Sequence, residues 1–227
     1  MSPVAKKFAH AAVAVTLLFA VPAARAATQD ETQLIDRARL AVEDVKRDKE
    51  FGNATSLARR ARAIMVVPRL FKAGFFVGGE GGGAVLLARG AKGWSAPAFY
   101  TLASASFGLQ IGAQESEVIM FIMSERALQA VLNNEFKIGA NAAFAIVTLG
   151  SSAELATTSA LRADIVVWAS STGAYAGITL NGSVLKPSNS YNQDFYGQAV
   201  TPRDIVVRRR VSNPMAAPLQ SAVATLG

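Results

Sequence analysis

The spacing of apolar residues changes near Pro68 and divides the chain into a helical part and a strand-like part. Over residues 28–50, apolar side chains recur every three or four positions and charges fill the opposite face, which is typical of an amphipathic helix. Thr28 and Glu31 have the spacing of a capping box, and Gly52 follows the pattern. We therefore expect a helix over 28–50 and a shorter one over 53–63, ended by Val66-Val67-Pro68.

Beyond Pro68, apolar segments of 5 to 8 residues alternate with Gly, Ser and Asn. Short apolar segments separated in this way favour strands, and Gly relieves crowding where a sheet bends. Ser124 can cap a helix in ERALQAVLNN, whereas the tail after Val211 has the composition of loosely structured chain. The predicted fold is α+β: N-terminal amphipathic helices packed on a curved, mostly antiparallel or barrel-like sheet with one inserted helix.

The first 26 residues have the pattern of an export signal. Lys6 and Lys7 precede an apolar stretch, and Ala24-Arg25-Ala26 forms a small-x-small cleavage site. The alternative is an uncleaved anchor, although the apolar stretch is shorter than the roughly 20 residues of a membrane span. We expect a signal over 1–26, one domain over 27–227, and a periplasmic or secreted protein.

Composition removes much chemistry from consideration. The chain has no Cys and its one histidine, His10, lies in the expected signal. Triads that need His, Cys-His dyads and the usual zinc, copper or haem sites therefore lack a residue type, so we expect no metal, no cofactor and no enzyme. Catalysis by carboxylate, lysine or tyrosine, and binding of a hard cation through oxygen ligands alone, stay open. Without Cys there is also no lipid-modified anchor of the lipoprotein kind.

The run Gly78-Gly79-Glu80-Gly81-Gly82-Gly83 resembles a phosphate-binding loop. A dinucleotide site needs a helix after the glycines, yet six residues later another glycine, Gly90, ends an apolar segment suited to a strand. No Gly-Lys-Ser or Gly-Lys-Thr follows for a P-loop. We interpret the run as the turn and bulge of a β-hairpin that joins FKAGFFV to GAVLLAR.

Two other patterns suggest catalysis only weakly. Ser183-Val184-Leu185-Lys186 matches the SxxK of penicillin-recognising enzymes, but it lies in a strand-like stretch ending at Pro187 rather than at the start of a helix. A glycosidase-type carboxylate pair stays open, because such pairs form in space. The acids available for it outside the first helix are Glu115, Glu117, Glu125, Asp164, Asp194 and Asp204.

Basic residues form two clusters that suit an anionic surface. The chain has 23 basic and 16 acidic residues. Near an anionic membrane each basic side chain contributes about 1 kcal/mol, so a cluster of five recruits without anchoring. Nucleic acid is excluded as a partner by the expected export and by the lack of aromatic residues among the arginines. The candidate lipid head-group residues are Arg59, Arg60, Arg62, Arg69, Lys72, Arg208, Arg209 and Arg210.

A series of short motifs resembles the SYLF domain family over about residues 55–207. The motifs, in order, are LARRARAIMVVP from Leu57, KAGFFVGG from Lys72, GGAVL from Gly82, GWSAPA from Gly93, GLQIGAQ from Gly108, GANAA from Gly139, YAGITLNGS from Tyr175, Asn192 with Tyr196-Gly197, and PRDI from Pro202. The resemblance implies a lipid-binding module directed at membrane phospholipids. Phosphoinositide and actin binding, known in eukaryotic relatives, are not carried over to a chain expected to be exported.

The resulting hypothesis is an exported, non-enzymatic protein that docks peripherally on anionic phospholipid through the basic clusters. The alternative is a structural or interaction protein of the envelope that binds a protein partner. A carboxylate-based hydrolase remains as a third hypothesis.

Overall fold

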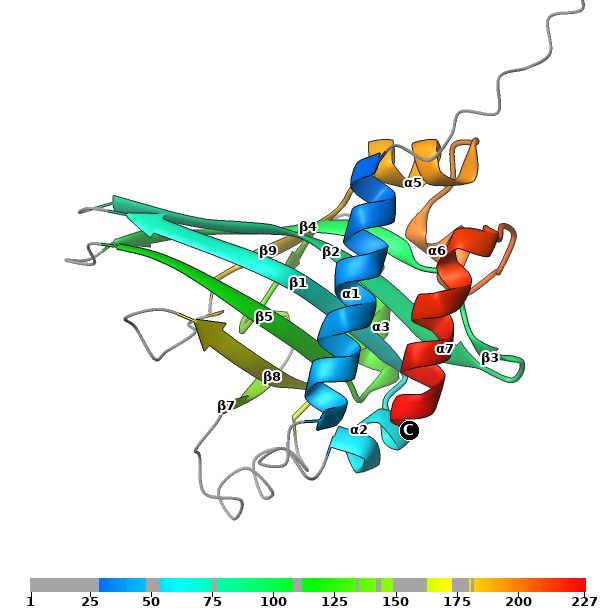
Figure 1. Cartoon of the computed structure of the whole chain (residues 1–227), viewed down its shortest axis with the longest axis horizontal. Helices are drawn as coiled ribbons and strands as arrows, with labels where there is room; N and C mark the ends of the chain where they lie inside the picture. Colours follow the sequence, from blue (N-terminus) through cyan, green and yellow to red (C-terminus); the bar gives the residue numbers. More distant parts are fainter. Residues whose placement is uncertain are drawn as a thin grey trace, which may run out of the picture.

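A curved sheet of nine strands lies at the centre of the molecule, with helices on both of its faces (Figure 1). The computed structural model describes residues 29–47, 54–74, 77–107, 112–133, 135–141, 144–148, 163–172, 180 and 182–227. Within these residues the strand order is β6-β9-β4-β2-β1-β5-β8-β7, and β3 pairs with β2. Every pair is antiparallel except β7 with β8, so the α+β fold class is confirmed.

The strands and helices have the following bounds. The strands are β1 (Ala63–Gly74), β2 (Val77–Gly90), β3 (Gly93–Trp94), β4 (Ala98–Phe107), β5 (Gly112–Ile122), β6 (Phe136–Lys137), β7 (Phe144–Thr148), β8 (Ile165–Thr172) and β9 (Val184–Pro187). The helices are α1 (Gln29–Arg47), α2 (Ala54–Arg60), α3 (Glu125–Val131), α5 (Asn189–Tyr196), α6 (Pro202–Val206), the short 3-10 helix η1 (Pro214–Ala216) and α7 (Ala217–Leu226).

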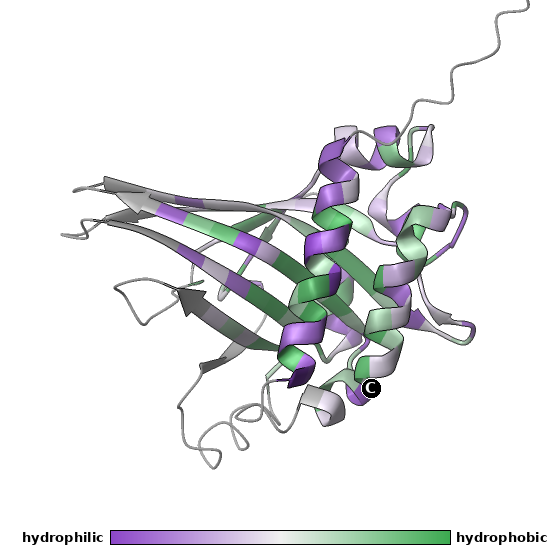
Figure 2. Ribbon diagram, in the orientation of Figure 1, coloured by the Kyte–Doolittle hydropathy of each residue, from purple (hydrophilic) through white to green (hydrophobic). Residues whose placement is uncertain are grey.

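One face of the sheet is covered by α1 and α7, which lie side by side across the strands (Figure 1). The apolar stripe of α1 is buried as its period predicts, and polar positions point outward (Figure 2). The stripe packs on strand residues of the same face, including Val66, Val85 and Ile119. The opposite face carries a second apolar cluster around Met65, Leu86 and other fully buried residues, to which α3 and α6 contribute.

Three elements of the sequence prediction are confirmed. The helix expected over 28–50 corresponds to α1, and α3 begins at Ser124, whose side chain accepts a hydrogen bond from Ala127 N. An antiparallel β1–β2 hairpin forms, although the segment after the glycine run pairs with residues Ala63 to Val66 and not with FKAGFFV. The curved, mostly antiparallel sheet is present (Figure 1).

Three predictions need correction. The second helix ends at Arg60, and β1 starts at Ala63, so Val66-Val67-Pro68 belongs to a strand. The chain after Val211 is not loose, because α7 buries Leu219, Val223 and Leu226. The glycine run lies inside β2 rather than at the turn.

The register explains why the glycines belong to the strand. Gly78 pairs with Gly74 on β1 and with Ser106 on β4, and the pairing continues on both sides through Gly81. The irregularity lies in β1, between Val66 and Phe71, opposite the last glycines. The expected bulge is therefore on the partner strand. The expected signal over 1–26 lies outside the described residues.

Candidate functional site

The eight basic residues singled out in the sequence are separated into three groups by the fold. The first group comes from α2 and the turn that precedes β1. Arg59 and Arg60 end α2, Arg62 follows, and all three side chains are exposed.

A fourth arginine, Arg89, joins this first group from the end of β2. Its Nη2 donates to the carbonyl of Ala58 at 2.7 Å, and its Nε donates to the carbonyl of Ala61 at 3.3 Å. The backbone N–H of Arg89 donates to the carbonyl of Arg62, so the two residues lie next to each other. The guanidinium carbon lies 4.4 Å from the ring centre of Trp94, in cation–π contact.

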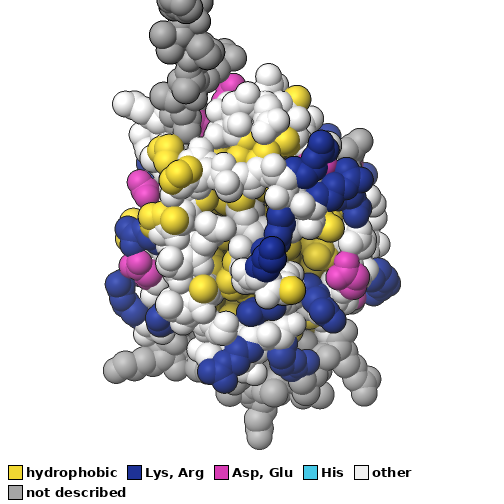
Figure 3. Space-filling view, turned by 90° about the vertical axis from the view of Figure 1, so that its right-hand side faces the viewer, with side chains coloured by type: hydrophobic (Ala, Val, Ile, Leu, Met, Phe, Trp, Pro, Cys, Tyr) yellow, Lys and Arg dark blue, Asp and Glu magenta, His cyan; other side chains and the backbone are white. Residues whose placement is uncertain are grey.

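Arg209 reaches the same end of the molecule from the C-terminal segment. Its Nη2 donates to the carbonyl of Gly93 at 2.5 Å, which places its charge at the β2–β3 hairpin beside the exposed Lys92. Figure 3 faces this end and shows many Lys and Arg side chains with few Asp or Glu. We call this set the hairpin-end surface: Arg59, Arg60, Arg62, Arg89, Lys92 and Arg209.

Sequence reasoning missed Arg89 and Lys92. They lie 27 or more positions after Arg62 in the chain, and only the pairing of β1 with β2 brings them together. No Asp or Glu side chain forms a salt bridge with any member of the hairpin-end surface among the described residues.

The neighbours of Arg209 have a structural task. Arg208 and Arg210 each place Nη1 within 2.9 and 3.2 Å of Asp204 Oδ1. Asp204 also accepts hydrogen bonds from the hydroxyl and backbone N–H of Thr201, in a capping box at the start of α6. These bonds hold the pKa of Asp204 well below its usual range, with the Thr201 side chain as the largest cause and Arg208 next. The two arginines therefore hold a helix cap.

Arg69 and Lys72 form the third group, in the outer half of β1. Arg69 Nε lies 2.8 Å from Glu115 Oε2, and Lys72 stands opposite Glu80 in the register. Burial raises the pKa of Glu80, and the Lys72 charge lowers it by a smaller amount. Arg69 lies seven positions after Arg62, roughly 23 Å along the strand at about 3.3 Å per residue. Arg69 and Lys72 are thus not part of the hairpin-end surface.

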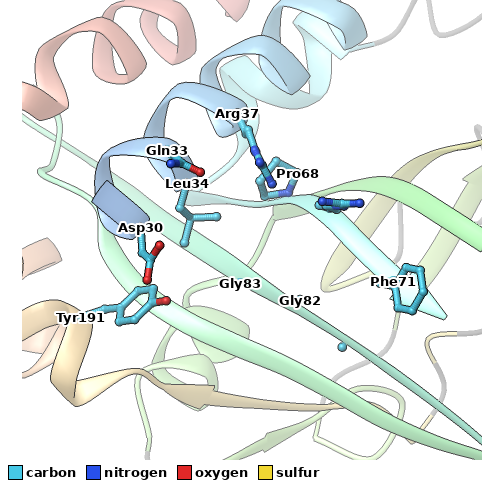
Figure 4. Close-up of a pocket in the computed structure, with 11 residues that line it drawn as sticks. Asp30, Gln33, Leu34, Arg37, Pro68, Phe71, Gly82, Gly83 and Tyr191 are labelled. Atoms are coloured by element: carbon cyan, nitrogen blue, oxygen red, sulfur yellow. The ribbon is translucent and has the colours of Figure 1, made fainter. Parts of the chain in front are cut away.

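Arg69 instead lines an open pocket of about 640 Å³ on the α1 face of the sheet. Figure 4 shows Gln33, Leu34 and Arg37 projecting from α1 above the strands, Asp30 beside Tyr191 at one end, and Phe71 at the other. The volume falls in the range of small-molecule sites. The lining residues are Asp30, Gln33, Leu34 and Arg37 of α1, Pro68, Arg69 and Phe71 of β1, Gly81, Gly82 and Gly83 of β2, and Tyr191 of α5.

The glycines form the floor of this pocket, and at Gly82 and Gly83 neighbouring atoms occupy the position that a Cβ would take. A Cβ on Gly82 would lie 2.2 Å from the carbonyl oxygen of Arg69, so only glycine fits against the bulged part of β1. A Cβ on Gly83 would meet the Leu34 side chain at 3.0 Å. At Gly81 the nearest atom is the Leu102 carbonyl oxygen at 3.6 Å, an ordinary contact.

Opposite charges lie at separate places in the pocket. Burial and then the charges of Asp30 and Glu31 raise the pKa of the Tyr191 hydroxyl, which marks the Tyr191 end as negative. Arg37 and Arg69 supply positive charge from α1 and β1. No salt bridge engages Arg37 within the described part of the chain.

The motifs that carry the family resemblance have mostly structural roles. Ser95 of WSAP accepts a hydrogen bond from Ala88 N, and Tyr196 donates to the carbonyl of Pro97 at 2.6 Å. Asn192 is fully buried and joins both backbone groups of Phe99, at 2.9 and 3.0 Å. Gly197 ends α5 with a φ of 69°, a conformation that favours glycine.

The catalytic candidates gain little from the fold. Ser183 is buried directly before β9, where no helix begins. Asp30 is the single carboxylate among the residues that line the pocket, and Asp164 is engaged by Ser124 and Arg126. Among the described residues no group of three or more acids could hold a metal ion.

The structure thus defines a class: α+β proteins with a helix-covered curved sheet, a basic end and an open pocket. The family model described as "Ysc84: Las17-binding protein actin regulator" matches residues 103–226. The chain belongs to this Ysc84 family, the SYLF family that its motifs resemble.

Several eukaryotic relatives are similar to the chain. Protein YSC84 of Saccharomyces cerevisiae is 32% identical over 167 residues, which cover 71% of this chain and 35% of the yeast protein. SH3 domain-containing YSC84-like protein 1 is 34% identical over 136 residues in Xenopus laevis, covering 59% of this chain and 41% of the relative. The Homo sapiens form is 30% identical over 149 residues, covering 65% and 43%. No solved structure matches the chain.

The chain spans less than half of the length of these relatives. The family description names a Las17-binding actin regulator, two of the relatives are named for an SH3 domain, and none of these names is that of an enzyme. Of the helices that the structure describes, none combines the length and the apolar character that a membrane crossing requires.

Proposed function

We propose that the protein binds anionic phospholipid surfaces through the hairpin-end surface. The observation that carries this proposal is the convergence of six basic side chains from α2, the β2–β3 hairpin and the C-terminal segment, with no Asp or Glu paired to them among the described residues. Such a patch attracts any negatively charged surface. The family resemblance selects phospholipid among those surfaces.

The expected strength is that of a reversible contact. At about 1 kcal/mol for each basic side chain near an anionic leaflet, six give about 6 kcal/mol, or a dissociation constant between roughly 1 mM and 1 μM. Surface charges are screened beyond a Debye length of about 8 Å at physiological salt, so binding weakens as salt rises.

Under this proposal, only some of the basic residues predicted from the sequence contact the lipid head group. Arg59, Arg60, Arg62 and Arg209 remain as head-group contacts, and Arg89 and Lys92 join them. Arg208 and Arg210 lie beside the surface but share their charge with Asp204. Arg69 and Lys72 have acidic neighbours of their own at the other end of β1, and we leave them out.

The test is sedimentation of the full chain with vesicles of anionic or neutral phospholipid at increasing salt. Replacing Arg59 and Arg62 with Gln removes about 2 kcal/mol and should weaken binding to anionic vesicles about thirtyfold. The matched control replaces Lys137 of β6 and Lys186 of β9 with Gln. Both lysines pair with Glu135. The control removes the same charge and should bind within about threefold of the wild type.

Three results would contradict the proposal. They are equal binding to neutral and anionic vesicles, indifference to salt, and the same loss in both double variants.

We also propose that the protein is exported, periplasmic or secreted, and peripherally attached to the membrane. This rests on the signal pattern over 1–26. Mass spectrometry of the processed N-terminus in the expressing bacterium tests it, and an intact Met1 on all recovered protein would refute it.

A second candidate function is binding to a protein partner, favoured by the description of the family as Las17-binding. Exposed large apolar side chains offer a contact for such a partner: Leu40, Phe71, Val207 and Met215. Cross-linking that captures one defined protein and is lost in Val207→Asp, in a chain indifferent to vesicles, would favour this function over lipid binding.

A further inference from the structure

The pocket on the α1 face carries charges of both signs at separate places, with apolar side chains beside them, which restricts the ligands that can fill it. Asp30 and the Tyr191 hydroxyl lie at one end, and Arg37 comes from the helix farther along (Figure 4). Leu34, Pro68 and Phe71 supply apolar surface. A simple anion would pair with the arginines but would leave Asp30 without a counter-charge. A simple cation would pair with Asp30 but would leave the arginines without one.

The backbone positions from which the two charged side chains extend are set by α1, and their separation gives the scale of the site. Asp30 and Arg37 are seven residues apart, about 10 Å along a helix with a rise of 1.5 Å per residue. A phosphate and an ammonium joined by two methylene groups span this distance once a charge-assisted hydrogen bond of about 2.8 Å is added at each end. Arg69 is paired through its Nε with Glu115 at the β1 wall, so it adds hydrogen-bond donors for the phosphate but little net charge, and Arg37 is the main counter-charge.

We propose that this pocket binds a zwitterionic phosphate–ammonium headgroup, as in phosphoethanolamine or phosphocholine. The phosphate lies between Arg37 and Arg69, and the ammonium lies against the Asp30 carboxylate and the Tyr191 ring. Phe71, 46% exposed at the open end, covers the first carbons attached to the phosphate. This site is independent of the membrane docking proposed above, because the hairpin-end surface lies at the other end of β1.

The glycine floor provides a steric test. Gly81 faces the pocket, its φ is not positive, and a Cβ there meets only the Leu102 carbonyl oxygen at 3.6 Å. Gly81→Val therefore fills the pocket from a strand position that accepts a β-branched residue. Gly79→Val is the matched control, since Gly79 lies two residues along on the same face of β2, does not line the pocket, and has no atom within 4 Å of its Cβ position.

The experiment is calorimetric titration of the full chain with soluble phosphoethanolamine, and with phosphocholine, inorganic phosphate and ethanolamine as separate probes. The zwitterions should bind saturably, and inorganic phosphate and ethanolamine should each bind at least tenfold more weakly. Gly81→Val should abolish binding, while Gly79→Val binds like the wild type. Thermal unfolding of both variants shows that each is folded.

Charge variants locate the two ends of the ligand. Arg37→Gln should weaken phosphoethanolamine binding about tenfold, whereas Arg39→Gln, two residues along α1 and paired with Glu43, should not. Asp30→Asn should weaken phosphoethanolamine and leave inorganic phosphate unchanged.

Further experiments distinguish a lipid headgroup from a free one, and separate failure of the pocket proposal from failure of the membrane-docking proposal. A short-chain lysophospholipid should bind more tightly than free phosphoethanolamine, and Phe71→Ala should remove the gain. Equal affinity for both would assign the pocket to the free metabolite headgroup and overturn the role of Phe71. The double variant Arg59→Gln, Arg62→Gln should bind anionic vesicles about thirtyfold more weakly and keep phosphoethanolamine binding. Any binding to neutral vesicles should be lost in Gly81→Val, which separates the pocket from the hairpin-end surface.

Three outcomes would overturn the zwitterion site: no binding by the wild type, unchanged binding by Gly81→Val, or phosphate binding as tight as phosphoethanolamine binding. Capture of a peptide that Gly81→Val blocks, without any headgroup binding, would assign the pocket to a protein partner instead.

Discussion

Glu80 is a carboxylate placed in the middle of the glycine run, on the sheet face opposite the pocket, and only 8% of it is exposed. Its partner across the register is Lys72, and its neighbour on β4 is Ser104. The pKa of Glu80 is raised because burial penalises the charged form more than Lys72 favours it.

This pKa shift predicts a pH-dependent stability. An acid whose pKa is higher in the folded than in the unfolded chain costs stability above the folded pKa, and the cost disappears as the pH falls toward the unfolded value near 4.5. Glu80→Gln should therefore raise the free energy of unfolding at pH 8, with a smaller gain at pH 4.5. Urea unfolding at both pH values measures the difference. A variant less stable than the wild type at pH 8 would show that the attraction of Lys72 outweighs burial.

Asn192 illustrates what a motif residue does in this chain. Its side chain pairs with both backbone groups of Phe99, as a neighbouring strand would do, and so ties α5 to β4. Ser95, Tyr196 and Gly197 likewise serve the backbone. These motif residues report on the fold, whereas the hairpin-end surface and the pocket combine motif residues with residues outside the motifs, such as Arg89, Lys92 and Arg37.

Among the elements, β2 depends most on individual glycines. Gly82→Ala would press a methyl group to within 2.2 Å of the Arg69 carbonyl oxygen, so β1 or β2 must shift. Overpacking of this kind costs about 1 to 3 kcal/mol, and we expect a loss near the upper end because the clash is with backbone. Gly81→Ala, with ordinary contacts, should be neutral or stabilise by up to about 1 kcal/mol. Chemical denaturation compares the two.

Equal destabilisation by both alanine variants would contradict this account of β2. It would mean that the strand requires glycine for backbone freedom along its length, and not for one close approach.

The elements that the sequence predicted well are those with strong local signals. The stripe of α1 and the Ser124 cap of α3 each follow from residues close together in the chain, whereas of the β1–β2 hairpin only its existence was predicted and not its register. The helix α7 was missed, although Leu219, Val223 and Leu226 have helical spacing, because Pro and small residues dominate its surroundings. Polar α5 buries little except Asn192 and Phe195, so its stability depends on contacts with β4.

At the scale of the whole molecule, the two candidate sites share β1 and β2 but lie at opposite ends of them. Arg89 reaches the hairpin-end surface only because the β1–β2 register places it beside Arg62. The pocket likewise needs α1, the bulged part of β1 and Tyr191 of α5 together. Such assemblies depend on sheet register and helix docking, so a single sequence identifies the arginines without showing which of them share a surface.

The two ends of β2 also differ in how firmly they are enclosed. From Ala84 to Ala88 the strand is at most 2% exposed and packs on both faces, whereas Gly81 to Gly83 have no side chains to contribute. Regions with few apolar contacts open at lower free energy than the core does, although both halves of β2 are hydrogen-bonded to β1 and β4. Amide hydrogen exchange should therefore become faster along this single strand from Leu87 toward Gly79. A ligand in the pocket would slow exchange at the glycine end, so the amides of β2 would report occupancy of the pocket.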